Sequence, residues 1–149
     1  RASFILSKVL SNAVGASIFI LAIPALAAYL EIFAATGFTI PLLPYIEALA
    51  VMLLTFMFYI ALSLMLGTFF QHRGPILAGT FGVLLGGMIL AQFWPILGDI
   101  LPLNMDRVAM AVLQGQELSP AMGYQLITAA FFSFLFIVAA LWRFGDEEF

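Results

Sequence analysis

The five residues Gln71-His72-Arg73-Gly74-Pro75 interrupt a long, nearly unbroken apolar stretch that runs from Tyr45 to Gly98. The apolar runs on the two sides of this segment are too long for strands and too uniformly apolar for the core helices of a soluble domain. A polar turn with a Gly-Pro pair between two such runs is typical of the tip of a hairpin of membrane-spanning helices. The chain is therefore expected to be built around this hairpin, with one further span on either side of it.

The composition agrees with a membrane protein. Hydrophobic residues make up 64% of the 149 residues, charged residues make up 9%, and the mean hydropathy is +1.16. Soluble domains average about 45–50% apolar and about 25% charged residues, so a soluble domain is excluded. A chain of this length has room for about four helices of roughly 20 residues each, with short connections. The absence of cysteine excludes disulfides, thiolate catalysis and cysteine-based metal sites.

The sequence predicts an all-α membrane protein with one transmembrane domain that covers residues 1–149. Its four membrane-spanning helices are expected at residues 9–30, 45–70, 76–98 and 121–142. Ser119 and Pro120 have the pattern of a helix N-cap followed by a first-turn proline, so the last helix is expected to begin there.

Two prolines lie within the predicted spans. Pro24 is expected to kink the first span or to loosen one of its turns, and Pro95 is expected to mark a bend near the end of the third. The first apolar run also ends in Ala25-Leu26-Ala27, which is compatible with a signal-peptide cleavage site. The run is longer than a usual signal-peptide core and three more spans follow it, so a retained span is the preferred interpretation.

The most polar linker, residues 99–120, is expected to contain a short amphipathic or re-entrant helix before the last span. The apolar residues of this segment recur at helical spacing: Met105, Val108, Ala109 and Val112. Asn104 or Asp106 is expected to begin the helix, and Gly115 is expected to end it.

The basic residues predict the orientation. Four spans place the N-terminus, the central turn and the C-terminus on one side of the membrane. That side carries four of the five basic residues, which are Arg1, Lys8, Arg73 and Arg143, whereas the other side carries only Arg107. Since Lys and Arg accumulate on the cytoplasmic side, we expect a multi-pass protein of the plasma (inner) membrane with both ends of this segment in the cytoplasm.

The sequence shows no catalytic set. The single histidine, His72, cannot form a zinc-binding HExxH motif, and the carboxylates lie in linkers or near the predicted interfaces. We therefore expect no enzyme activity, no cofactor and no metal in this chain. Ion-coupled transporters usually carry charged groups within their spans, and no charged residue lies at mid-span here. Any transport is therefore expected to draw its energy from an ATP-driven partner.

A few residues within the spans are candidates for helix packing or for a transport pathway. Gly82-Val-Leu-Leu-Gly86 in the third span is a GxxxG motif, whose spacing lets two helix backbones approach closely. Asn12, Tyr59 and Gln92 are the polar candidates for a pathway, and each of them also suits a role in holding helices together.

The start, the middle and the end of the chain resemble one family. The opening Arg1-x-x-Phe4-Ile5-x-x-Lys8, followed directly by a span, resembles the end of the cytoplasmic coupling segment of type-2 ABC exporter permeases, and Ser7-Lys8 matches the small-residue-lysine pair of that segment. Residues 61–73, ALSLMLGTFFQHR, are similar to the fourth helix of the family where it enters its basic cytoplasmic turn. Leu141-Trp142-Arg143-Phe144 with its charged tail is similar to the usual C-terminus.

This resemblance implies that the chain is the C-terminal four-helix portion of a six-span permease, in which the linker before the last span is often re-entrant. It also implies a separate or fused ABC ATPase subunit that hydrolyses ATP, with Arg1, Phe4 and Lys8 flanking the contact with it. A second permease copy or homologue would complete a dimer in contact with membrane lipids, and no nucleic acid is implied.

Two other functions compete with the permease. The first is a structural or assembly membrane protein that binds a partner helix through the glycine-rich third span. The second, a small lipid-processing enzyme, is disfavoured by the missing catalytic groups. The residues leave the transported substrate open.

Overall fold

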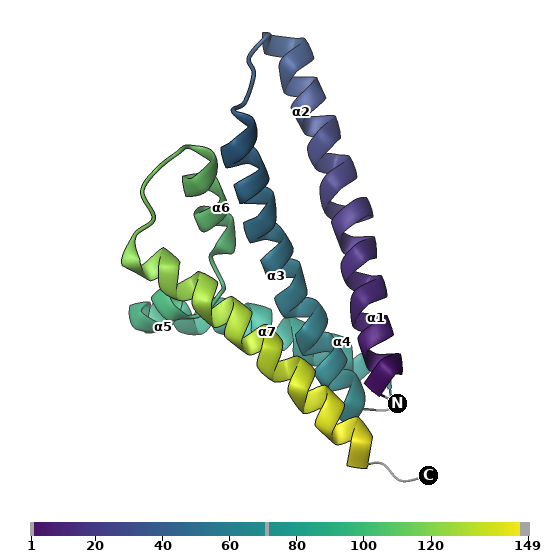
Figure 1. The fold of residues 1–149 in the computed structure, drawn as a ribbon. Helices are drawn as coiled ribbons and strands as arrows, with labels where there is room; N and C mark the ends of the chain where they lie inside the picture. The colour runs from purple at the N-terminus through teal and green to yellow at the C-terminus, as the bar shows by residue number, and fades with distance from the viewer. Residues whose placement is uncertain (1, 71, 147–149) are drawn as a thin grey trace.

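The computed structural model describes residues 2–70 and 72–146, and every regular element in that part of the chain is a helix (Figure 1). The elements are α1 (Ala2–Gly15), the π-helix η1 (Ala16–Ala22), α2 (Ile23–Thr36), α3 (Leu42–Phe69), α4 (Arg73–Phe93), α5 (Pro95–Ile100), α6 (Met105–Leu113) and α7 (Pro120–Asp146). Four segments are long and apolar enough to cross a membrane: Leu10–Thr36, Leu42–Phe69, Arg73–Phe93 and Pro120–Arg143. The predicted all-α class with four candidate spans is confirmed, and the fold is compatible with a multi-pass membrane protein.

The first span contains a π-helical segment just before Pro24, where the sequence predicts a kink or a loosened turn. Proline lacks an N–H, so Pro24 cannot donate the α-helical hydrogen bond to the carbonyl of Ile20. The chain responds in the preceding turns, because η1 uses the wider π pattern and the N–H of Ile23 donates to the carbonyl of Ile18. The residues before and after η1 keep right-handed helical dihedrals. Thus α1, η1 and α2 follow one another without an intervening loop.

The connection between the first two spans is short and anchored at both ends. The helix α2 continues beyond the predicted limit of residue 30 and ends before Gly37, which has the left-handed φ of +66° that glycine adopts without strain. The Tyr45 hydroxyl donates to the carbonyl of Ala25 at 2.5 Å, and the Tyr45 and Tyr29 ring centroids are 5.4 Å apart. These two tyrosines tie the start of α3 to α2.

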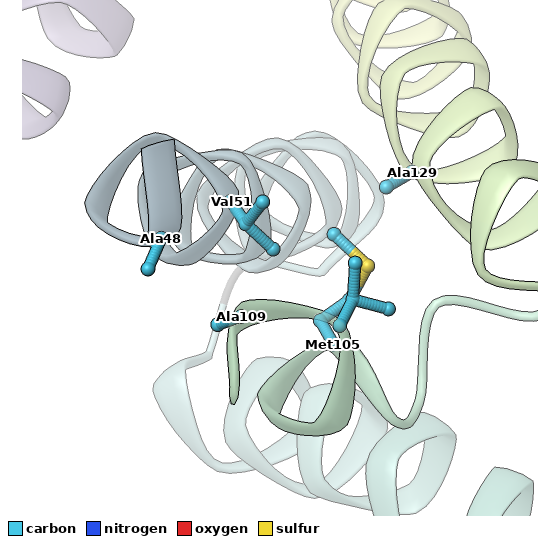
Figure 2. Packing of buried hydrophobic residues seen from close by; sticks show 6 residues of the cluster. Ala48, Val51, Met105, Ala109 and Ala129 are labelled. Atoms are coloured by element: carbon cyan, nitrogen blue, oxygen red, sulfur yellow. The ribbon is translucent and has the colours of Figure 1, made fainter. Parts of the chain in front are cut away.

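The helix α3 is the centre of the fold, because α1, η1, α4, α6 and α7 all contact it. The largest cluster of buried residues joins α3 to α6 and α7 and consists of Ala48, Val51, Met105, Val108, Ala109 and Ala129. Figure 2 shows Met105 reaching from α6 into the space between Val51 of α3 and Ala129 of α7. Half of this cluster is alanine, and such small side chains let helix backbones approach closely.

A second buried layer continues the contact between α3 and α7 toward the other end of both helices. Phe58, Ala61 and Leu62 of α3 are buried there, and so is Ala140 of α7. The ring centroids of Phe58 and Phe136 are 5.8 Å apart, within the range of favourable aromatic pairs. The two layers make α3, α6 and α7 one packed unit.

The helix α4 packs against α3 near its start and has no buried residue. The Ser63 and Thr80 hydroxyl oxygens lie 3.2 Å apart across that contact. The helix ends at Phe93 rather than at the predicted Gly98, because Trp94 is extended and Pro95 starts the separate helix α5. A residue that precedes a proline is disfavoured in the α conformation. The bend predicted at Pro95 is therefore a complete break of the helix.

The segment before the last span agrees with its predicted limits. The helix α6 has Asn104 as its N-cap and ends at Leu113, and Gly115 follows with a left-handed φ of +66°. The Ser119 side-chain oxygen accepts a hydrogen bond from the N–H of Met122 at 3.3 Å, as its predicted N-cap role requires. The short amphipathic helix is thus present, and its re-entrant insertion in a membrane stays a prediction.

The start of α1, the end of α3 and the end of α7 lie at one end of the bundle (Figure 1). The Arg143 guanidinium lies 5.9 Å from the centre of the Phe69 ring, which joins the last two of these segments. This arrangement is the one that four spans require. Which side of the membrane this end faces stays a prediction.

Candidate functional site

The predicted ATPase-coupling residues lie at the very start of the chain. Arg1 lies outside the described residues, and so do the side chains of Phe4 and Lys8. The backbone of residues 2–15 forms α1, which leads directly into η1 and α2 and contacts α3 and α7. The described part of the segment that carries the resemblance is therefore in helical continuity with the first span, and the helix to which it belongs contacts the packed unit.

The predicted packing glycines lie on an open face of α4. A Cβ atom added at Gly82 or at Gly86 would meet no other atom within 4 Å. The close glycine contacts of this helix are elsewhere, since a Cβ at Gly79 would lie 3.0 Å from a Leu66 methyl carbon and one at Gly87 would lie 3.0 Å from a Leu103 methyl carbon. The GxxxG motif therefore joins no two described helices of this chain, and its use against a partner stays a prediction.

The three predicted pathway residues do not converge on one site. Asn12 is exposed on α1, and Gln92 is exposed near the end of α4. Tyr59 is half-buried on α3, with its ring edge-to-face against Phe58 at 5.1 Å between centroids. Within the described part of the chain, no side-chain hydrogen bond involves any of the three.

A concave site lies around α5 and α6 and consists of two adjoining clefts. The larger cleft has a volume of about 360 Å³, and its polar lining is Gln92, Asp99, Asn104 and Arg107. The smaller cleft has a volume of about 140 Å³ and adds Ser119 and Gln125 on the side of α7. Because Asp99, Asn104 and Arg107 line both clefts, the two form one continuous polar site.

Side chains of α7 hold α5 in place beside this site. The Gln125 Nε2 group donates to the carbonyl of Gly98 at 2.7 Å, and the Thr128 hydroxyl donates to the carbonyl of Ile100. Both acceptors belong to the last turn of α5, where helix carbonyls have no partner within the helix. Gly98 is itself buried, and a Cβ added there would lie 3.3 Å from the Cβ of Ala91. The short helix α5 is thus fixed between α4 and α7.

The site contains charges and a polar atom without partners. Asp99 and Arg107 carry opposite charges, yet no ion pair or side-chain hydrogen bond joins either of them to another residue in the described ranges 2–70 and 72–146. Gln125 is only 5% exposed, and its Oε1 atom has no hydrogen-bond partner. A buried polar atom without a partner costs about 1–3 kcal/mol, so it calls for a donor from outside the chain.

The site offers hydrogen-bonding and charged groups from several elements. In the part of the chain that the structure describes, no group of three His, Asp or Glu side chains is placed to hold a metal ion. Arg107 is suited to an anion, and Asp99 is suited to a cation.

Most of these residues stand out in the sequence, but the sequence does not predict that they form one site. Asp99, Asn104 and Arg107 belong to the predicted polar linker, and Gln92 is predicted to line a pathway or to hold helices together. Gln125 and Thr128 were missed. The available signal was their spacing of three residues on an otherwise apolar helix, where polar side chains commonly bind a neighbouring helix.

Comparisons of the chain with protein-family models, with curated proteins and with solved structures find no match. The resemblance to type-2 ABC exporter permeases therefore stands on the quoted residues and stays a prediction.

Proposed function

We propose that this chain is the membrane-spanning permease subunit of an ATP-driven ABC-type exporter. The observation that carries the proposal is the continuity of α1, η1 and α2. The residues that resemble the coupling segment lie at the start of a helical path that enters the first span without a loop. A force applied to residues 2–8 would therefore act directly on a membrane helix.

The contacts of that helix suggest how the force spreads. Both α1 and η1 contact α3, and α1 also contacts α7. The helices α3, α6 and α7 share a buried core. When the first span tilts, it would therefore move relative to this packed unit as a whole and not relative to three independent helices. The π-helical segment at Ala16–Ala22 is a natural place for the span to bend, because π-helical turns are one of the known causes of sharp helix bends.

The sequence suggests that the energy for transport comes from a partner and not from this chain. No Asp, Glu, Lys or Arg lies at the middle of a span, so ion coupling within this chain is disfavoured. In the proposal, an ABC ATPase subunit hydrolyses ATP, and this chain with a second permease copy or homologue converts the closure of the ATPase into alternate access. Both ends of the segment face the cytoplasm of the plasma (inner) membrane, and the chain itself carries out no bond chemistry.

The test is whether an ATPase depends on residues 1–8. The protein is purified from its native membrane in mild detergent, and ATP hydrolysis by the co-purified complex is measured. We expect the double variant Arg1→Glu, Lys8→Glu to lose at least about tenfold in ATPase activity or in recovered ATPase, which corresponds to about 1.4 kcal/mol of contact energy.

The control is Arg73→Glu, which reverses a single basic charge at the start of α4. It should leave both quantities close to wild type. Three outcomes would contradict the proposal. The double variant and the control could lose equally, the double variant could leave ATP hydrolysis unchanged, or the purified complex could contain no ATPase.

One observation favours the competing structural or assembly role. The face of α4 that contains Gly82 and Gly86 is open, and it could receive a partner helix closely. Cross-linking in membranes tests this role with Gly82→Leu plus Gly86→Leu, and Leu77→Phe on an exposed part of the same helix is the control. If only the glycine variant loses the cross-linked partner and no ATPase is ever recovered, the assembly role replaces the permease.

A further inference from the structure

The two clefts around α5 and α6 contain a pair of opposite charges that no described residue of the chain pairs with. Asp99 at α5 and Arg107 at α6 line both clefts, and both are exposed. No ion pair joins them to each other or to another residue within 2–70 and 72–146. A ligand that bears both a cation and an anion would satisfy both groups at once.

Gln125 adds a second and independent requirement. Its Nε2 group is already committed to the carbonyl of Gly98, so the amide cannot be reversed without bringing two oxygen acceptors together. The remaining Oε1 atom is buried and has no donor, and Gln125 forms part of the wall of the smaller cleft. The cationic part of the ligand should therefore carry N–H groups.

From these groups we infer that the clefts bind a zwitterion with a primary ammonium group and a phosphate, which is the chemistry of phosphoethanolamine. The Arg107 guanidinium is suited to the phosphate, because its fork of N–H donors matches phosphate oxygens. The Asp99 carboxylate and the Gln125 Oε1 atom are suited to the ammonium, which has three donors. This inference does not depend on the proposed coupling to an ATPase.

The surroundings of the clefts favour a lipid as the source of this head group. The larger cleft has an apolar rim of Met88, Ala91 and Leu103 beside its polar groups. Phe93, Trp94 and Ile96 are exposed next to it, at the point where the apolar helix α4 ends. Tryptophan and exposed apolar residues beside polar groups are typical of the membrane–water interface, where lipid head groups lie.

A pair of lipids with identical acyl chains and the same phosphate tests the inference. Phosphatidylethanolamine has N–H donors on its head group, whereas phosphatidylcholine has a trimethylammonium group that has none. Binding of each lipid to the purified full chain in detergent is measured by native mass spectrometry. We expect phosphatidylethanolamine to bind about tenfold more tightly, because only its head group can donate to Asp99 and Gln125.

Two substitutions at exposed positions separate the roles of the charges without disturbing the core. Asp99→Asn should reduce the preference for phosphatidylethanolamine to the part that Gln125 supplies, and Arg107→Gln should weaken the binding of both lipids by about tenfold. Asp106→Asn and Glu117→Gln are matched controls, because these nearby acidic residues are exposed and line neither cleft. Both controls should bind phosphatidylethanolamine as the wild type does.

Free phosphoethanolamine then distinguishes the two sources of the head group. Failure to displace the lipid at millimolar concentration supports a lipid site, and displacement supports a site for the same chemistry in soluble form. Equal binding of the two lipids by the wild type would overturn the inference, as would an undiminished preference in Asp99→Asn. Equally tight binding of phosphatidylglycerol would also overturn it, because the site would then recognise an anion only.

Discussion

The packed unit of α3, α6 and α7 and the flanking helices α1–η1–α2 and α4 differ in burial but hardly in apolarity. The most apolar windows of α3 and α7 have mean hydropathies of 2.4 and 2.1, and 22% of each window is buried. The corresponding windows of the first span and of α4 have values of 2.2 and 1.9, and none of either window is buried. Hydropathy therefore marks all four helices alike and does not reveal which of them form the interior.

The difference lies in the size and placement of side chains. In a bilayer the surrounding lipid is as apolar as a leucine side chain, so helices associate through close packing rather than through a hydrophobic driving force. Ala48, Ala61, Ala129 and Ala140 supply small contact positions in α3 and α7. The flanks instead expose large side chains, and these faces are available to lipid or to the proposed second permease copy.

The largest effect should come from removing a phenylalanine in each region. Phe58 on α3 is 4% exposed, whereas Phe19 on η1 is 71% exposed. We expect Phe58→Ala to lower the free energy of unfolding by about 3 kcal/mol, because neighbouring helices cannot fill the cavity. Phe19→Ala should change it by less than about 0.5 kcal/mol. Equilibrium unfolding in mixed detergent micelles measures the free energy of unfolding of both variants. Comparable losses of stability in the two variants would contradict the difference between the packed unit and the flanking helices.

A pair of methionines tests the same distinction within one short helix. Met105 and Met110 both belong to α6, but Met105 is 1% exposed and Met110 is 53% exposed. We expect Met105→Ala to cost about 2 kcal/mol in the same unfolding measurement, since it empties the space between α3 and α7. Met110→Ala should stay within about 0.5 kcal/mol of wild type. A larger loss for Met110→Ala would place the buried face of α6 elsewhere.

The sequence predicts local features of this fold well. The short helix α6, its start at Asn104 and the cap at Ser119 follow from capping and periodicity that act over a few residues. Pro24 predicts either a kink or a loosened turn, and the structure has the second, because the same missing N–H can produce a π-helical segment. Which helices pack together was out of reach, since every span has an apolar surface on all sides.

The candidate site was harder to predict for a related reason. Asp99 and Arg107 are close to each other in sequence, but Gln125 comes to them only because α7 packs beside α5. The three residues come together only through tertiary contacts between helices. The helix break at Trp94, which separates α5 from α4, is predicted from the sequence only as a bend. The apolar context of Gln125 was the one local sign of its role.

Enlarging a small residue should have a moderate effect that depends on which face of α7 it occupies. Ala129 is fully buried against α3 and α6, and the next residue, Ala130, is exposed. We expect Ala129→Leu to destabilise the protein by about 1–3 kcal/mol through overpacking. Ala130→Leu should have an effect below about 0.5 kcal/mol. Unfolding in micelles again provides the measurement, and a neutral Ala129→Leu would mean that this contact is looser than alanine packing implies.

The smallest effect should come from a hydroxyl that links two helices. The Thr128 hydroxyl can donate to the carbonyl of Ile100 on α5 or to a carbonyl of its own helix, whereas the Thr55 hydroxyl donates to the carbonyl of Val51 within α3 at 3.0 Å. Thr128→Val keeps the shape and removes the link, so we expect a loss of about 1 kcal/mol.

Thr55→Val removes a bond to a carbonyl that the helix already satisfies, and its expected cost is only a few tenths of a kcal/mol. Hydrogen exchange of the α5 amides should accelerate about fivefold in Thr128→Val, because 1 kcal/mol is about that factor in an opening equilibrium. It should stay unchanged in Thr55→Val. Unchanged exchange in both variants would show that α5 is held by Gln125 and apolar packing alone, and that it belongs to the packed unit without the hydroxyl.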